Sequence, residues 1–173
     1  MSANLLELRQ HWPTHPALAG LPLGAAAWAI AGGLDRSTLV VCPTEAMASQ
    51  LAVDINFHLG GSAPVVVLPP DDVRPYDGMS PHAEVIRRRI RATLLLHSGR
   101  PGVVVSSTRG IVHKLLSAEA LEALTLRLAP GMATDRELLA QTLVRHGYHG
   151  VAKVTEPGTM SSRGNIIELS DNL

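Results

Sequence analysis

The stretch Gly102-Val103-Val104-Val105-Ser106-Ser107 contains an unbroken run of β-branched residues. Two similar apolar runs precede it in the 173-residue chain, at residues 38–41 and 64–68. None of the three alternates apolar with polar side chains, which is typical of strands that are covered on both faces. We therefore expect three buried strands of a parallel sheet.

Helical patterns separate these runs. After Thr44, a candidate N-cap, apolar residues recur with helical spacing until Gly60-Gly61 ends the helix: Ala48, Leu51, Ala52, Ile55 and Leu59. A second helix is expected to open at Ser80-Pro81 and to end at Ser98-Gly99, with an apolar stripe of Ile86, Ile90 and Leu94. Strands that alternate with helices predict an α/β fold, a parallel sheet flanked by helices.

The pattern changes at about residue 117. We expect a short helix at 118–123, a half-exposed strand at 124–128, and a helix that opens with the capping box Thr134-Asp135-Arg136-Glu137 and ends at Gly147. Residues 151–154 and 166–169 should then form a long hairpin. The sequence therefore predicts two domains, residues 1–116 and a small α+β domain at residues 117–173.

Composition excludes several classes of protein. Only 17% of the residues are charged and the formal net charge is zero, so any nucleic-acid site must be a local patch. Residues 18–34 approach the length of a membrane span, but Pro22 and four glycines interrupt them, which favours a buried helix and no membrane partner. The single cysteine, Cys42, excludes an internal disulfide and fits a reducing cytoplasm, where we expect the protein.

A nucleotide site is not expected. The nearest approach to a phosphate-binding loop is Gly20-Leu21-Pro22-Leu23-Gly24-Ala25-Ala26, where Ala25 and Ala26 replace the lysine and the hydroxyl residue that bind phosphate and magnesium. The histidine pairs 11/15 and 146/149 lack acidic or cysteine partners at metal-site spacing. The sequence therefore predicts no catalytic residue, no cofactor and no metal.

The most distinctive segment is Pro69-Pro70-Asp71-Asp72-Val73-Arg74-Pro75-Tyr76-Asp77-Gly78-Met79-Ser80-Pro81. It resembles the P-x-x-E-x-x-P-Y-D-x-x-S-P segment of the family that contains UvrB and the transcription-repair coupling factors. Residues 102–110, 147–148, 156–164 and 166–169 resemble later motifs of the family, in the same order. The three aspartates of this segment, Asp71, Asp72 and Asp77, are interpreted as turn-forming rather than metal-binding.

This resemblance implies a function. It identifies residues 1–116 as a degenerate RecA-like domain and residues 117–173 as a shortened UvrA-binding domain, and the missing lysine favours the coupling factors over UvrB. The implied role is non-catalytic recruitment of UvrA in transcription-coupled nucleotide excision repair. RNA polymerase and DNA would be reached only through further domains of a parent ATP-dependent translocase. The alternative is an autoinhibitory or structural clamp with weak or no UvrA binding.

Two sets of site residues follow. The resemblance places UvrA contacts at Arg163 and Gly164, and at His149 and Met160, where relatives commonly have a basic and an aromatic residue. Arg87, Arg88 and Arg91 are the second set, a possible basic patch for phosphate or an acidic partner. The alternative, which we favour, is a solvated helix face on which Glu84 pairs with Arg87 and Arg88.

Overall fold

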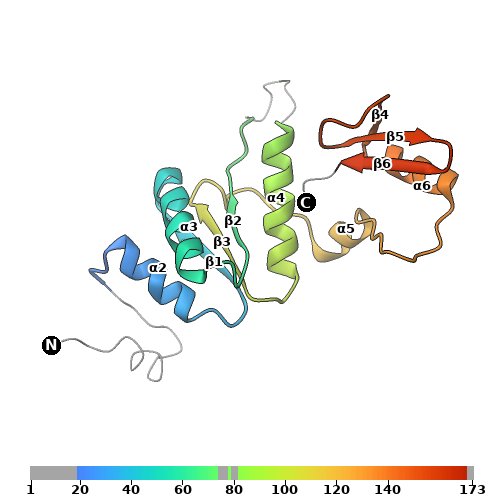
Figure 1. Cartoon of the computed structure of the whole chain (residues 1–173). Coiled ribbons are helices and arrows are strands. Elements are labelled where there is room, and N and C mark those ends of the chain that lie inside the picture. Colours follow the sequence, from blue (N-terminus) through green and yellow to red (C-terminus); the bar gives the residue numbers. More distant parts are fainter. Residues whose placement is uncertain (1–18, 74–77, 79–81, 171–173) are drawn as a thin grey trace. The chain divides into compact units, whose positions relative to one another are not determined.

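The computed structural model of the chain describes residues 19–73, 78 and 82–170 (Figure 1). The chain divides into two compact units, Met1–Leu116 and Ser117–Leu173. Within the described ranges, no helix is both long enough and apolar enough to cross a bilayer.

The first unit contains a parallel three-stranded sheet with the strand order β1-β3-β2. Val40 of β1 pairs with Val105, and Val66 of β2 pairs with Val104. The elements follow one another as α2 (Leu23–Gly32), β1 (Ser37–Cys42), α3 (Glu45–Leu59), β2 (Val65–Leu68), α4 (Ala83–His97) and β3 (Gly102–Ser107). The predicted α/β fold, with three parallel strands at these runs, is confirmed.

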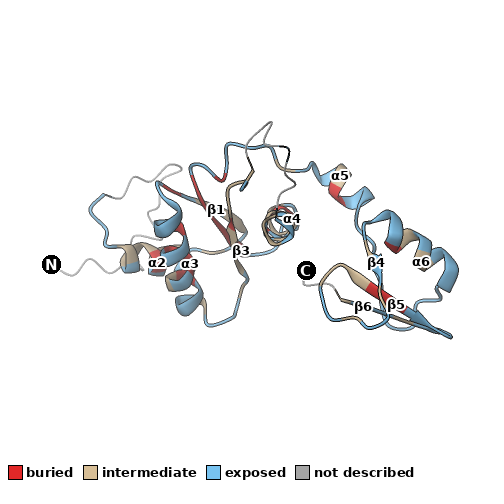
Figure 2. Ribbon diagram, turned by 90° about the horizontal axis from the view of Figure 1, so that it is seen from above, coloured by how far each residue is buried: buried red, intermediate tan, exposed pale blue. Residues whose placement is uncertain are grey.

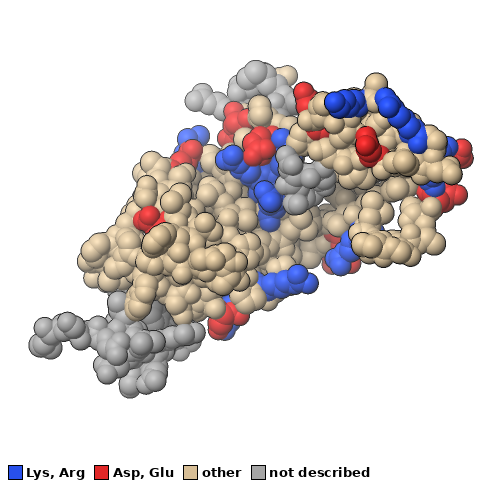
Figure 3. Space-filling model, viewed as in Figure 1, with Lys and Arg blue, Asp and Glu red and all other residues tan. Residues whose placement is uncertain are grey.

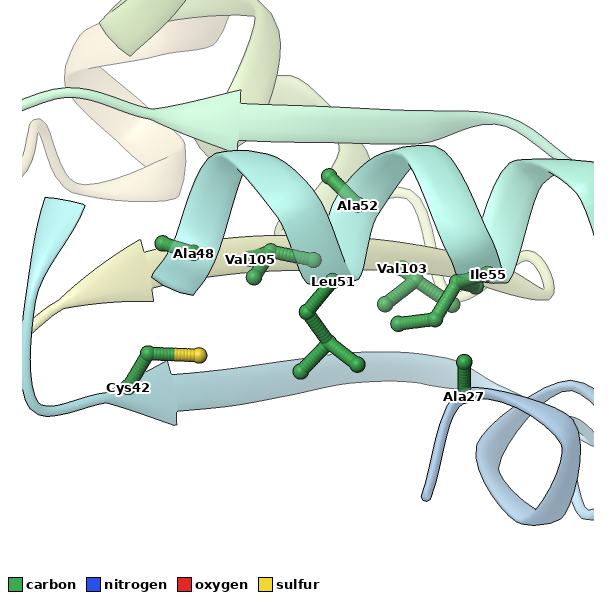
Figure 4. Close-up of a cluster of buried hydrophobic side chains, with 8 residues drawn as sticks. All are labelled: Ala27, Cys42, Ala48, Leu51, Ala52, Ile55, Val103 and Val105. Carbon is green, nitrogen blue, oxygen red and sulfur yellow. The ribbon is translucent and has the colours of Figure 1, made fainter. Parts of the chain in front are cut away.

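The central strand β3 divides its side chains between two cores. Val103 and Val105 pack with Ile55 of α3 and Ala27 of α2 (Figure 4), whereas Val104 packs with residues of β2 and α4. Accordingly, α2 and α3 cover one face of the sheet and α4 covers the other (Figure 2). All three valines have no exposed surface, which explains why the run shows no alternation.

Helix α3 begins and ends as the sequence predicts. The Thr44 side chain accepts a hydrogen bond from the Met47 N–H at 3.2 Å, and Gly60 adopts the left-handed conformation with φ 55°. Both devices satisfy backbone groups that a helix end leaves unpaired.

Helix α4 differs from its prediction in two respects. It begins at Ala83 with His82 as N-cap, and Ser80 and Pro81 lie outside the described residues. The expected stripe was wrong, since Ile86 is 42% exposed and the buried residues are Ala92 and Thr93. Ala92 packs with Val104 and Leu68, and the partly buried Leu95 and Leu96 pack against the same cluster. The face of α4 that contacts the sheet is therefore formed by these residues rather than by the predicted stripe.

The second unit contains a small mixed sheet with the order β4-β5-β6. β4 runs parallel to β5, and β5 pairs antiparallel with β6. Its elements are α5 (Ala118–Ala123), α6 (Arg136–Arg145), β4 (His149–Gly150), β5 (Thr159–Arg163) and β6 (Ile166–Ser170).

Three predictions for this unit need correction. Residues 124–128 are not a strand; their leucines at 124, 126 and 128 are all exposed, and neither sheet includes them. The hairpin partner of β6 is β5, because the two-residue turn Gly164-Asn165 connects them, and of residues 151–154 only Val151 donates to this sheet, through its N–H to the Met160 carbonyl. The N-cap of α6 is Asp135, one residue after the expected Thr134, and the helix runs from Arg136 to Arg145.

Candidate functional site

The degenerate phosphate-loop residues lie at the start of α2. The helix begins at Leu23, so Gly24, Ala25 and Ala26 belong to its first turns, and Gly20 precedes it with φ 74°. N-cap Pro22 makes no side-chain cap hydrogen bond. Residues 20–26 therefore supply neither a cation nor a hydroxyl to bind a phosphate.

The carboxyl ends of β2 and β3 carry a network of the protein's own polar groups. Arg89 of α4 donates Nη1 to the carbonyls of Pro69, at 2.8 Å, and Gly110, at 3.3 Å. Its Nε lies 3.0 Å from Asp71 Oδ1, and Asp71 Oδ2 lies 2.9 Å from His113 Nδ1. We call Arg89, Asp71 and His113 the Arg89 cluster. In open α/β sheets ligands usually bind at the carboxyl ends of the strands, which is where this cluster lies.

The turn-forming interpretation was therefore wrong for Asp71, whose carboxylate forms an ion pair with Arg89 and contacts His113. Asp72 accepts a hydrogen bond from the backbone N–H of His82, ten residues further along the chain, at 3.1 Å. Asp77 lies outside the described residues. No group of three potential metal ligands occurs in the part of the chain that the structure describes.

The arginine-rich face of α4 is partly neutralised by its own helix. Arg87 Nη2 and Arg88 Nε lie 3.1 and 2.8 Å from the carboxylate oxygens of Glu84, so the expected pairs are present. The hydrogen bonds from Arg88 and then Arg87 lower the pKa of Glu84. In Figure 3 basic and acidic side chains lie together at the start of α4 rather than in separate surfaces. Arg91 is exposed on the same helix.

The β5–β6 hairpin carries the other predicted site. Arg163 is the last residue of β5, directly before the turn, and Gly164 has φ 55°, a conformation that glycine adopts without strain. The Arg163 Nη2 group donates to the Ala152 carbonyl at 3.0 Å, and the Ser161 hydroxyl donates to the same oxygen at 3.3 Å. This bond holds the exposed guanidinium beside the sheet.

All four residues that the resemblance indicated belong to this sheet or its turn. His149 is exposed on β4, where its N–H donates to the Gly158 carbonyl and the residue pairs with Thr159. Met160 is only 8% exposed, so its side chain contributes to the interior of the unit rather than to an accessible surface. The accessible part of the predicted site is therefore Arg163, Gly164 and His149.

The sequence motifs included residues 166–169 but did not indicate Arg136, which also lies at this turn. Arg136, in the first turn of α6, donates Nη1 to the Gly164 carbonyl. On β6, Ile166 is 67% exposed and Leu169 is 36% exposed. A separation of 28 residues between Arg136 and Gly164 leaves no local signal of this contact. We call Arg163, Gly164, Arg136 and Ile166 the hairpin surface.

Comparison with known proteins identifies the class to which this arrangement belongs. No protein-family model matches the chain. A UvrABC system protein B from Chlorobium limicola is 38% identical over 86 residues, which are half of this chain. The chain is thus homologous to a component of the nucleotide-excision-repair machinery.

The match extends further in a second group of relatives. A transcription-repair-coupling factor from Myxococcus xanthus is 38% identical over 144 residues, 80% of this chain, and one from Haemophilus influenzae is 27% identical over 90% of it. The chain spans 12% and 14% of the lengths of these two proteins, and 13% of the Chlorobium protein. The chain belongs to this DNA-repair family and corresponds to the UvrB-like region of the transcription-repair-coupling factors, which confirms the resemblance seen in its motifs.

Proposed function

We propose that the chain is a non-catalytic protein-interaction module that recruits UvrA during transcription-coupled nucleotide excision repair in the cytoplasm. Residues 1–116 act as a degenerate RecA-like scaffold, and residues 117–173 act as the UvrA-binding domain. RNA polymerase, DNA and ATP-driven translocation belong to other domains of the parent factor.

The observation that carries this proposal is the exposure of the hairpin surface. Ile166 is 67% exposed although it is a large aliphatic residue in a strand, and it pairs directly with Arg163 across the hairpin. Exposed apolar groups next to an arginine are typical of protein interfaces, where arginine is enriched among the residues that dominate binding.

The geometry of the sheet adds support. β6 pairs only with β5 in the described sheet, so its outer edge is available to a partner. Such an edge offers backbone donors and acceptors to another chain. The bond from Arg163 to the Ala152 carbonyl holds its guanidinium in place, which lowers the entropic cost of binding.

The non-catalytic part of the proposal rests on the first unit. Its phosphate-loop residues carry no lysine and no hydroxyl group, and phosphoryl transfer depends on such groups to neutralise charge. The Arg89 cluster lies at the edge of the sheet where an α/β protein would bind a ligand. There Arg89 instead bonds to the loops that follow β2 and β3.

Calorimetry with purified UvrA tests the proposal. The wild-type chain should bind, and Arg163→Ala should weaken binding about tenfold or more, as expected when an arginine at the centre of an interface is truncated. Arg145→Ala is the matched control, because Arg145 is also an exposed arginine of this unit but lies at the other end of α6 from Arg136. The absence of heat with the wild-type chain would exclude UvrA recruitment, and micromolar binding of ATP would contradict the interpretation of residues 20–26 as a non-functional phosphate loop.

A further inference from the structure

Two arginines from different elements form hydrogen bonds within the small sheet or its β5–β6 turn. Arg163 reaches its position from the end of β5, and Arg136 reaches the Gly164 carbonyl from the first turn of α6. Because Gly164 directly follows Arg163, Arg136 contacts the turn at the residue next to Arg163. Arg136 donates to the Gly164 carbonyl and Arg163 donates to the Ala152 carbonyl, so both acceptors are backbone groups.

These contacts leave most of the donor capacity unused. A guanidinium carries five N–H donors, and backbone carbonyls bear no net charge to balance it. Within the described ranges, neither Arg136 nor Arg163 forms an ion pair with a carboxylate, in contrast to Arg87, Arg88, Arg89 and Arg109 of the first unit. The turn therefore presents two positive charges that the rest of the described chain does not neutralise.

The position of Arg136 is not explained by the stability of its helix. A cation in the first turn opposes the helix dipole, which favours negative charge at that end. Asp135 and Glu137 on either side of it satisfy that preference, and Arg136 instead extends to the hairpin. The Arg136 side chain therefore stabilises the β5–β6 turn rather than the start of α6.

The surroundings favour a protein partner over a nucleic acid. Residues 117–173 contain seven Asp and Glu against five Lys and Arg, a net charge of −2, which would repel a polyanion. Exposed Ile166 pairs with Arg163 on the same face of the hairpin. Two positive charges beside an exposed apolar side chain are complementary to an acidic patch on the surface of a folded protein.

We propose that Arg136 and Arg163 act as a pair that binds adjacent carboxylates on the partner, and that Arg136 is a second docking residue of the hairpin surface. The inference rests on the proposed function and specifies the chemistry of the UvrA surface that the hairpin recognises. Guanidinium groups bind carboxylates through paired hydrogen bonds, so two of them can select for two suitably spaced acids.

Binding of UvrA at a series of salt concentrations tests the pair. Arg136→Gln removes the charge but keeps an N–H donor for the Gly164 carbonyl, and Arg136→Lys keeps the charge. We expect Arg136→Gln to weaken binding about tenfold and to reduce its salt dependence, as the loss of one charge-assisted hydrogen bond would. Arg136→Lys should retain most of the affinity, and Arg145→Gln should match the wild-type chain. Circular dichroism checks that each variant is folded.

The possible results separate the two proposals. If the wild-type chain binds UvrA but Arg136→Gln binds equally well, the role of Arg136 is overturned and UvrA recruitment stands. Equal losses in Arg136→Gln and Arg145→Gln would indicate a general charge effect and would also overturn it, as would a lysine variant as weak as the glutamine variant. If Arg136→Gln instead reduces binding to duplex DNA, the ligand is phosphate and the acidic-protein assignment is wrong. No binding by the wild-type chain would remove both proposals.

Discussion

Arg89 and Asp71 form a partly buried ion pair that joins α4 to the segment after β2, with Nε 3.0 Å from Oδ1. The side chains are 12% and 26% exposed. The same guanidinium also donates to the carbonyls of Pro69 and Gly110, so one side chain connects the helix to the loops that follow both β2 and β3.

Arg89→Ala should therefore destabilise the first unit by about 2–3 kcal/mol, because it leaves the partly buried Asp71 carboxylate without this partner and frees two carbonyl groups. Trp28 lies on α2 of this unit and residues 117–173 contain no tryptophan, so urea unfolding can be followed by tryptophan fluorescence without a signal from the second unit. The control is Arg88→Ala, whose exposed ion pair with Glu84 should contribute less than about 1 kcal/mol. Equal losses in the two variants would contradict the special role of Arg89.

Gly110 lies against the end of β3 with no room for a side chain. A Cβ atom at this position would lie 2.2 Å from Ser106 Oγ and 2.9 Å from the Leu68 carbonyl oxygen. Gly110→Ala should lower the free energy of unfolding by about 1–3 kcal/mol, the usual cost of overpacking a close-packed site.

Gly24→Ala provides the contrast. A Cβ at Gly24 would meet nothing within 4 Å, and the residue lies in α2. This variant should stabilise the protein by up to about 1 kcal/mol, because alanine has the higher helix propensity. Thermal unfolding of both variants should therefore show shifts of opposite sign, and a Gly110→Ala variant as stable as the wild-type protein would contradict the packing at Gly110.

Two large apolar residues of α3 differ sharply in how far they are buried. Ile55 has no exposed surface and packs against the sheet, whereas Phe57 is 80% exposed. Ile55→Ala should cost about 2–5 kcal/mol through lost burial and the cavity that remains. Phe57→Ala should change stability by less than about 0.5 kcal/mol, as usual for an exposed position. Denaturant unfolding of the two variants checks this, and a large loss at Phe57 would place that ring in a contact that the fold does not include.

Glu84 should titrate below the ordinary range of a glutamate. Its pKa is lowered by hydrogen bonds from Arg88 first and Arg87 second. Because the folded-state pKa is the lower one, the stabilisation is present above the unfolded pKa of about 4.3 and is lost as the pH falls through the folded pKa. NMR titration of the Glu84 carboxyl should give a pKa that rises in Arg88→Gln.

Arg91→Gln serves as the control for that titration, since no ion pair joins Arg91 to Glu84 among the described residues. Its Glu84 pKa should stay close to that of the wild-type protein. An unchanged pKa in Arg88→Gln would show that the pair does not persist in solution.

The hairpin surface illustrates what sequence reasoning can and cannot reach. The family motif drew attention to Arg163 and Gly164, and both lie at the exposed turn. It did not indicate Arg136, which reaches the turn from a helix 28 residues earlier in the chain. It also did not indicate that Met160 is buried, because the apolar and polar residues of β5 do not alternate clearly.

The sequence by itself determined the α/β class, the three parallel strands and the ends of α3, because continuous β-branched runs and capping residues act over a few neighbouring positions. Only the tertiary structure decided which face of α4 is buried, which strand pairs with β6, and where Asp71 and Arg136 find their partners. Those outcomes depend on the packing of segments that are distant in the chain, and short-range patterns carry no record of such contacts.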